Sequence, residues 1–215
     1  MQKRKIISVS VAIVFTLSFV CWTALISFID VQAIGPQNSK VGFATVNEFF
    51  HHLTGVNMSL YIITDWLGLV PIAFAFGFAI LGLVQWIKRK SLRKVDYSLF
   101  VLGGFYIVVF LVYLLFEYVV INYRPVLINN YLEASYPSST TMLVLCFMPT
   151  AIMQFNARIK NNYLKNAIFF IISAFMLFMV VGRFIAGVHW FSDIIGGFLL
   201  SIGLVSTYYF ISLLR

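Results

Sequence analysis

The chain alternates long apolar runs with short polar segments. Six runs, each close to the length of about 17–25 residues that crosses a bilayer as a helix, carry few charges. They are Ile6–Ile29, Trp66–Ile87, Tyr97–Ile121, Ser139–Phe155, Ala167–Gly182 and Ile194–Leu214. None of them alternates polar and apolar side chains with the two-residue period of a barrel strand. The pattern therefore predicts an all-α protein, a bundle of six transmembrane helices.

Composition narrows the class of protein further. Hydrophobic residues make up 61% of the 215 residues and charged residues only 10%, and the mean hydropathy is +0.96. These values exclude an ordinary soluble domain and are typical of a protein with several membrane spans. We expect a single membrane domain over residues 1–215. Cys21 and Cys146 lie inside apolar runs, so we interpret them as packing residues and predict no disulfide.

The basic residues predict the orientation. In a six-span arrangement, twelve of the fifteen lysines and arginines fall on one side of the membrane. They are Lys3, Arg4, Lys5, Lys88, Arg89, Lys90, Arg93, Lys94, Arg158, Lys160, Lys165 and Arg215. Cytoplasmic loops are enriched in Lys and Arg, so we expect both termini inside, in a bacterial plasma membrane. The net charge of +8 then reflects topology and contacts with anionic lipid, and we expect no nucleic-acid partner.

The longest polar connection, residues 30–61, falls on the outer side. Its stretch from Thr45 to Glu48 has the capping-box pattern that starts a helix. Apolar residues follow at helical spacing, and Gly55 is a plausible end. We predict a short amphipathic helix at the outer interface.

The strongest candidate for chemistry lies at the start of the last span. Arg183, His189 and Asp193 are close in sequence at the outer edge of the bundle, where charged residues are costly and therefore functional candidates. Asp193 follows His189 by four residues. On a helix it could accept a hydrogen bond from one ring nitrogen and aim the other nitrogen as a nucleophile.

Arg124, Ser138 and Ser139 could bind an anion beside this trio. Arg124, like Arg183, carries forked donors that suit a phosphoryl group. Ser138 and Ser139 begin the fourth span, where free amides at a helix N-terminus favour an anion. The sequence therefore indicates a site that holds phosphate and attacks it.

This arrangement resembles the type 2 phosphatidic acid phosphatase family, which shares its core with the vanadium haloperoxidases. The family motifs are Lys-x6-Arg-Pro, Pro-Ser-Gly-His and Ser-Arg-x5-His-x3-Asp. Here they stand as Glu117-x6-Arg124-Pro125, Pro137-Ser138-Ser139-Thr140 and Gly182-Arg183-x5-His189-x3-Asp193. The resemblance covers residues 66–215 and is most specific in the third motif.

The resemblance implies a lipid phosphatase that forms a phosphohistidine. His189 would attack phosphorus, Asp193 would orient it, and Arg124 and Arg183 would hold the phosphoryl oxygens. Amides of Ser138 and Ser139 would add donors. The substrate would be a phosphorylated lipid, either a glycerolipid phosphate or a polyprenyl diphosphate, and the site would face outside.

Two departures from the motifs bear on the chemistry. Thr140 stands where the family has the His that protonates the leaving group, and a hydroxyl is too weak an acid for that role. Glu117 replaces the Lys of the first motif and could pair with Arg124 or Arg183, or sit protonated in the bundle. Loss of a general acid typically costs about 10²–10⁴-fold. A diphosphate, whose leaving group is a stable phosphate, should suffer less than a phosphate monoester.

Several alternatives stay open. His51 and His52 in the outer loop could supply the missing acid, or could simply face headgroups and water. Asp65 could be functional or an interfacial residue that caps the second span. With no further His and no suitable Cys spacing, we predict neither a metal site nor a cofactor.

Two rival functions also remain. The chain could be a pseudo-enzyme that binds phosphorylated lipids through Arg124 and Arg183 without turnover, or a carrier that moves them across the bilayer. No second polar site lies at the midplane, which counts against the carrier. The oligomeric state is left open.

Overall fold

The computed structural model describes residues 2–214 and contains helices and connecting loops. The helices are α1 (Gln2–Phe28), α2 (Ala44–Thr54), α3 (Met58–Leu67), α4 (Leu69–Arg89), α5 (Tyr97–Tyr118), α6 (Ser139–Arg158), α7 (Asn162–Ile185) and α8 (Phe191–Ser212), with short 3₁₀ turns η1 (Pro36–Asn38) and η2 (Leu92–Lys94). Within residues 2–214, six segments are long and apolar enough to cross a membrane. The predicted all-α bundle of six spans is confirmed.

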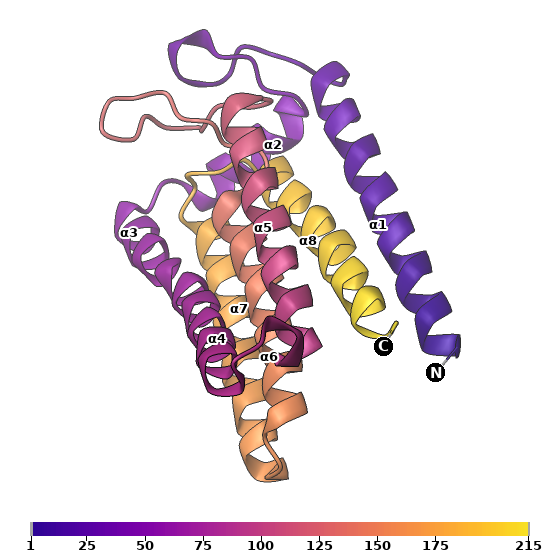
Figure 1. Cartoon of the computed structure of the whole chain (residues 1–215). Coiled ribbons are helices and arrows are strands. Elements are labelled where there is room, and N and C mark those ends of the chain that lie inside the picture. The colour runs from indigo at the N-terminus through magenta and orange to yellow at the C-terminus, as the bar shows by residue number, and fades with distance from the viewer. Residues whose placement is uncertain (1, 215) are drawn as a thin grey trace.

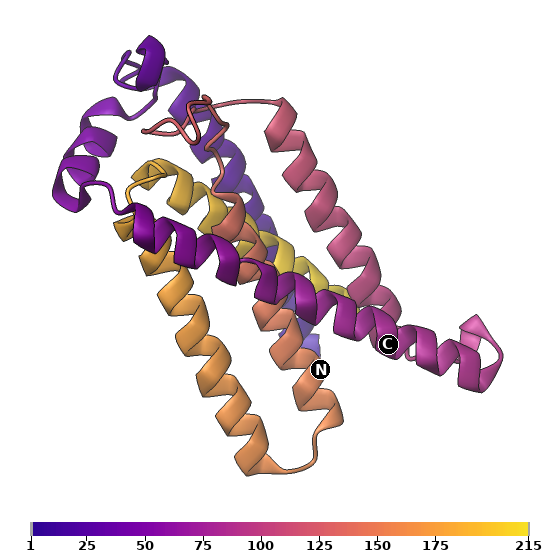
Figure 2. The ribbon, with the colours of Figure 1, turned by 90° about the vertical axis from the view of Figure 1, so that its left-hand side faces the viewer.

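Most of the long helices run between the two ends of the bundle, and α4 crosses α6 and α7 obliquely (Figure 2). Helix α1 begins at the same end of the bundle at which α8 finishes (Figure 1). That end also carries η2 and the turn between α6 and α7. The opposite end carries α2 and the long loop between α5 and α6, seen again in Figure 2. The segments expected to be cytoplasmic thus share one end, and those expected to lie outside share the other.

Helix α6 forms the centre of the bundle. It packs against α4, α5, α7 and α8, and Val144, Cys146 and Ala151 on it are completely buried. Most other spans expose large hydrophobic side chains along their outer faces, as expected where lipid rather than water surrounds them. Helix α1 packs mainly along α8.

Two glycines set how closely α8 approaches the loop that precedes α6. A Cβ atom on Gly196 would lie 2.4 Å from the Tyr136 ring, and one on Gly197 would lie 3.1 Å from the Ser138 carbonyl oxygen. The absence of these side chains lets the start of α8 lie against residues 136–138. This contact brings the second and third motifs together.

The second span begins earlier than predicted. Helix α3 starts at Met58, not at Trp66, and continues through a break at Gly68 into α4. The Asn57 side chain accepts a hydrogen bond from the Leu60 amide at 2.9 Å and so caps the new start. Asp65 therefore lies inside a helix and does not cap the span.

The predicted amphipathic helix is present as α2 and ends at Gly55, but it starts differently from the prediction. Its N-cap is Phe43, and Thr45 lies within the helix. The Asp30 carboxylate accepts a hydrogen bond from the Thr45 amide at 2.7 Å, so a distant carboxylate replaces the expected capping box. Buried Asn47 bonds Ser192 through its side chain at 2.9 Å, which docks α2 onto the start of α8.

Candidate active site

The loop between α7 and α8 aims His189 into the end of the bundle. Gly187 has a φ of +65°, and a Cβ atom there would lie 1.8 Å from the Gly55 carbonyl oxygen. Next to it, the Asn57 amide donates to the Ala186 carbonyl at 3.0 Å. Glycine is required both for the left-handed turn and for the close contact. The turn leaves His189 almost completely buried, at 4% exposure.

The hydrogen bonds around His189 select its tautomer. The Ser135 hydroxyl donates its only proton to the Asp193 carboxylate, at 2.5 Å. The Nδ1 atom of His189 lies 3.0 Å from the Ser135 Oγ atom and 3.2 Å from the Ser135 carbonyl oxygen. Both oxygens can then only accept, so Nδ1 carries the hydrogen and Nε2 keeps its lone pair. This is the tautomer that a nucleophile needs.

His189 is held in the neutral form. Burial lowers the pKa of its imidazole well below the ordinary value of 6.5, and the charges of Arg124 and Arg183 lower it further. The hydrogen bond to the Ser135 backbone opposes the shift without cancelling it. A neutral ring with a free Nε2 is ready to attack an electrophile at pH 7.

Within the described residues, Asp193 and His189 form no direct hydrogen bond, contrary to the expected pair on one helical face. The reason is that α8 begins at Phe191, so His189 lies in the preceding loop. The Asp193 carboxylate accepts hydrogen bonds from Ser135, from the Trp190 amide at 3.0 Å and from the Asn122 side chain at 3.2 Å. The Ser135 side chain therefore links the Asp193 carboxylate to the His189 ring.

Arg183 is buried and bridges two side chains. Its Nη2 atom donates to the Asp65 carboxylate at 2.7 Å and to the Thr140 hydroxyl at 2.6 Å. Its guanidinium lies 4.9 Å from the centre of the Tyr61 ring. Arg183 itself is 1% exposed, so a partly exposed carboxylate balances a buried cation.

Arg124, in the loop between α5 and α6, also lies near the Tyr61 ring. Its guanidinium lies 5.8 Å from the centre of the Tyr61 ring, and its Nε atom lies 3.1 Å from the Glu133 carboxylate. The backbone joins the same pair of residues, because the Arg124 amide donates to the Glu133 carbonyl at 3.0 Å. Within residues 2–214, neither arginine forms an ion pair with Glu117, so of the two alternatives for Glu117 the pairing with an arginine is not observed.

Buried polar atoms without hydrogen bonds collect at this site. Within the part of the chain that the structure describes, they include Nε and Nη1 of Arg124, Nε of Arg183 and Nε2 of His189. The Arg124–Glu133 pair is close enough for charge attraction, but its geometry does not make a hydrogen bond. Three cationic donors and one lone pair thus lack partners, and buried groups of this kind need one.

The second motif contributes less than expected. The Ser138 amide donates to the Asp193 carbonyl at 3.0 Å, and its hydroxyl bonds Thr141 at 3.0 Å, so Ser138 has little left for an anion. Ser139 and Thr140 occupy the first turn of α6, where amides have no acceptor within the helix. Glu117 lines a narrow cleft beside Ser139.

The two outer-loop histidines differ in position. His52 is exposed on α2 and lies 3.7 Å from Glu48, so it faces away from the bundle. His51 is half-buried against Trp190, with ring centroids 5.4 Å apart, and burial lowers its pKa. Only His51 lies near the segment that carries His189.

Sequence reasoning missed Ser135, Asn122 and Glu133. They lie outside the three motifs, in a polar loop whose path cannot be read from periodicity. The loop folds back on itself, with the Ser135 amide donating to the Asn122 carbonyl at 2.9 Å. The one available signal was a cluster of polar residues close to Arg124 in the sequence.

Comparisons with known proteins agree with this geometry. A family model described as the PAP2 superfamily matches residues 102–214. A comparison with curated protein sequences gives no match. Among solved structures, the chain is similar to one described as the first transmembrane PAP2 type phosphatidylglycerolphosphate phosphatase from Bacillus subtilis.

The structural likeness extends over nearly the whole of both proteins. The TM-score is 0.56 with 18% identity, over 94% of this chain and 95% of that chain. At this identity the likeness establishes the fold, and the family model supplies the relationship in sequence. The chain is an integral membrane protein, and it belongs to the PAP2 superfamily.

Proposed function

We propose that the protein is a membrane lipid phosphatase that acts at the outer membrane face through a phosphohistidine. The observation that carries the proposal is the free Nε2 atom of His189, buried beside unpartnered donors of Arg124 and Arg183. A phosphoryl group would satisfy these donors and present phosphorus to the lone pair. The positive-inside distribution of Lys and Arg supports the outer face.

The reaction would proceed in two displacements. The Nε2 lone pair of His189 attacks phosphorus, and the bond from phosphorus to the leaving oxygen breaks with its electrons on that oxygen. Asp193, acting through Ser135, stabilises the positive charge that develops on the ring. Water then attacks the phosphohistidine, releases phosphate and restores the neutral ring, while the two arginines balance the charge on the phosphoryl oxygens.

The leaving group decides which lipid suits the site. The Thr140 hydroxyl bonds Arg183 and is a poor proton donor. A glycerolipid monoester leaves as an alkoxide and needs a proton, whereas a diphosphate leaves as a stable phosphate. We therefore favour a polyprenyl diphosphate over phosphatidate, with the arginines rather than a metal ion supplying the positive charge.

Two observations favour the second candidate, a pseudo-enzyme that only binds phosphorylated lipids. Asp65 and Glu133 already balance the charges of Arg183 and Arg124, and the acid position holds Thr140. A binding site, however, has no need for a histidine aimed by Ser135 and Asp193. The link from Asp193 through Ser135 to His189 therefore makes turnover the better proposal.

The deciding experiment is phosphate release by purified protein from a polyprenyl diphosphate and from phosphatidate, each with and without His189→Ala. Release that depends on His189 supports the enzyme, and a faster diphosphate reaction supports the leaving-group argument. Release equal to the His189→Ala background on both lipids would leave the binding function. Binding of the lipid that is lost in Arg124→Gln would then support the pseudo-enzyme.

A further inference from the structure

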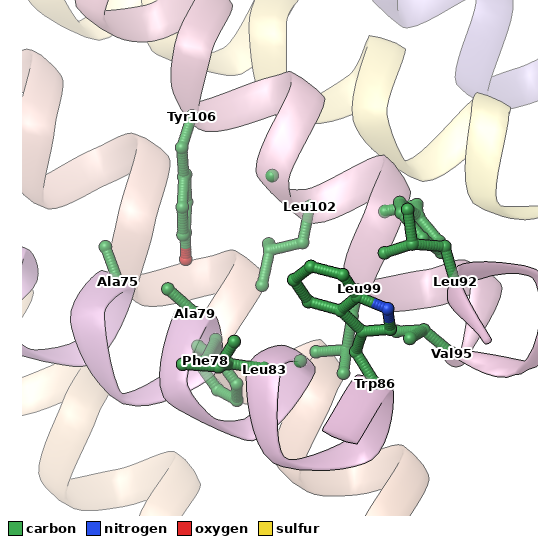
Figure 3. A pocket seen from close by; sticks show the side chains of 13 residues that line it. Ala75, Phe78, Ala79, Leu83, Trp86, Leu92, Val95, Leu99, Leu102 and Tyr106 are labelled. Carbon is green, nitrogen blue, oxygen red and sulfur yellow. The ribbon is translucent and has the colours of Figure 1, made fainter. Parts of the chain in front are cut away.

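A cavity lies between α4 and α5, with η2 at one end, and this end of the bundle is the one away from His189. We call this cavity the α4–α5 groove (Figure 3). Its volume is about 300 Å³, and its lining is almost wholly apolar. Buried Phe78, Leu99 and Leu102 form its floor, while exposed side chains such as Leu83 form its rim.

Small residues create this groove. Ala75, Ala79 and Gly82 lie on one face of α4, and Gly103 lies opposite on α5. A Cβ atom on Gly82 or on Gly103 would meet nothing within 4 Å, so these glycines do not serve close helix packing. The two helices instead diverge from their shared turn (Figure 2). The space between them, about 300 Å³ with an apolar lining, suits a hydrocarbon chain.

The two polar groups of the lining do not favour a polar ligand. The Tyr106 hydroxyl bonds Thr150 on α6 at 3.1 Å, and the Trp86 indole lies beside Leu92 and Val95 (Figure 3). Both α4 and α5 are membrane spans, so lipid surrounds the opening. An acyl chain is the occupant that this surface accepts.

The chain beside the groove is strongly basic. Leu92 and Val95 line the groove, and the last turn of α4 and the connection that follows it carry Lys88, Arg89, Lys90, Arg93 and Lys94. The nearest acidic group, Asp96, is 2.9 Å from Arg89 and 3.7 Å from Arg158. Within residues 2–214, the other four cations form no ion pair, and all four are exposed.

We propose that the α4–α5 groove binds an anionic phospholipid of the leaflet opposite the active site. One acyl chain would fill the groove, and the phosphate would lie against Lys88, Lys90, Arg93 and Lys94. Charge complementarity selects this occupant, because a zwitterionic lipid or a second copy of this basic chain would leave the four cations unbalanced. The site is separate from the proposed catalysis and does not depend on it.

Trp86 provides a direct probe, because it lines the groove. The full chain would be titrated in detergent with phosphatidylglycerol or phosphatidylcholine carrying brominated acyl chains, which quench indole fluorescence. The Trp86 contribution is the difference between the wild type and Trp86→Phe. We expect half-maximal quenching of Trp86 at an about ten-fold lower concentration of phosphatidylglycerol, since basic residues near the surface attract anionic lipid.

Two variants separate the binding of the lipid headgroup from the binding of its acyl chain. The fourfold change of Lys88, Lys90, Arg93 and Lys94 to Gln should abolish the preference, whereas the matched change of Lys3, Arg4 and Lys5 to Gln should retain it. Gly103→Leu should reduce quenching by both lipids, and circular dichroism would check its fold. Inorganic phosphate at the same concentration should not displace the lipid.

The proposal would be overturned by equal quenching in the two lipids, or by a preference that survives the fourfold change. Displacement of the lipid by inorganic phosphate alone would show that the site binds an anion and does not hold an acyl chain. Loss of lipid quenching as protein concentration rises would instead assign the groove to a second copy of the chain. None of these outcomes depends on whether His189 is catalytic.

Discussion

The buried guanidinium of Arg183 is held by the carboxylate of Asp65, with 2.7 Å between Nη2 and Oδ1. The Arg183 side chain is 2% exposed and that of Asp65 is 57% exposed. A phosphoryl group that uses Arg183 must therefore share it with Asp65 or displace it. If Arg183 binds the substrate, Asp65 would orient the arginine beforehand and compete with the phosphoryl group for it.

Asp65→Asn tests that competition. Removing the carboxylate charge should lower KM for the phosphorylated lipid about two- to five-fold, because solvent screens the exposed Asp65 carboxylate and limits its attraction for Arg183 to about 1 kcal/mol. It should also lower Tm, since Arg183 keeps its charge in a buried place. Inorganic phosphate should raise the Tm of the variant more than that of the wild type.

Asp96→Asn is the matched control for this change. Asp96 also pairs with an arginine, Arg89 at 2.9 Å, but at the far end of the bundle. We expect no change in KM from it. A KM for Asp65→Asn that equals or exceeds the wild-type value would show that Asp65 aids binding and does not compete.

Ser135→Ala tests the relay between Asp193 and His189. The change removes the hydroxyl that donates to Asp193 at 2.5 Å and that lies 3.0 Å from Nδ1 of His189. Without it the ring loses its link to the carboxylate, and we expect kcat to fall about 10²-fold with little change in KM, as for an interaction used in the transition state. Steady-state kinetics on the better lipid would measure both values.

A second serine provides the control for the relay. The Ser39 hydroxyl is buried but forms no hydrogen bond within the described residues, so Ser39→Ala should leave kcat unchanged. A Ser135→Ala enzyme with normal kcat would mean that the Ser135 carbonyl alone positions His189.

The sequence predicted the six spans, because hydropathy is a local property. It also predicted that Arg124, Arg183 and His189 can meet, because six spans place the segments that carry them on the same side of the membrane. It could not predict the partners of these residues. Asp65 and Arg183 lie on helices far apart in the chain, and only the packing of α3 on α7 brings them together. Similarly, the position of His189 before α8 depends on a turn that hydropathy does not reveal.

Thr140→His tests the leaving-group argument. A histidine at this position would restore a proton donor near Arg183 and should increase the rate with phosphatidate by at least about 10-fold, toward the 10²–10⁴-fold typical of general acids. The rate with a polyprenyl diphosphate should change much less. The ratio of kcat/KM for the two lipids is the measurement, and it cancels any loss of active protein.

The matched control is Thr141→His, one residue further along α6, where the side chain bonds Ser138 and not Arg183. It should not raise the phosphatidate rate. Equal stimulation of both lipids by Thr140→His would indicate that proton donation does not distinguish them, and the preference for a diphosphate would then have to be abandoned.

The electrostatic environment of His189 predicts the pH range in which its imidazole takes up a proton. Burial, Arg124 and Arg183 together lower its pKa well below 6.5, so the ring should remain neutral at pH 6.5, and the nucleophilic form should be lost only as the pH falls further. Histidine-labelled NMR spectra of the protein would follow the titration directly. Comparison with His189→Asn would assign the signal.

Replacing Arg124 separates charge from burial. Arg124→Gln removes one of the two cations, so the pKa of His189 should rise and its titration should move to higher pH. Lys40→Gln removes an equal charge from the same end of the bundle. Because the charges that lower the pKa of His189 are those of Arg124 and Arg183, this change should not move the titration. If Arg124→Gln left the titration in place, burial and Arg183 would keep the ring neutral without Arg124, and Arg124 would act only on the substrate.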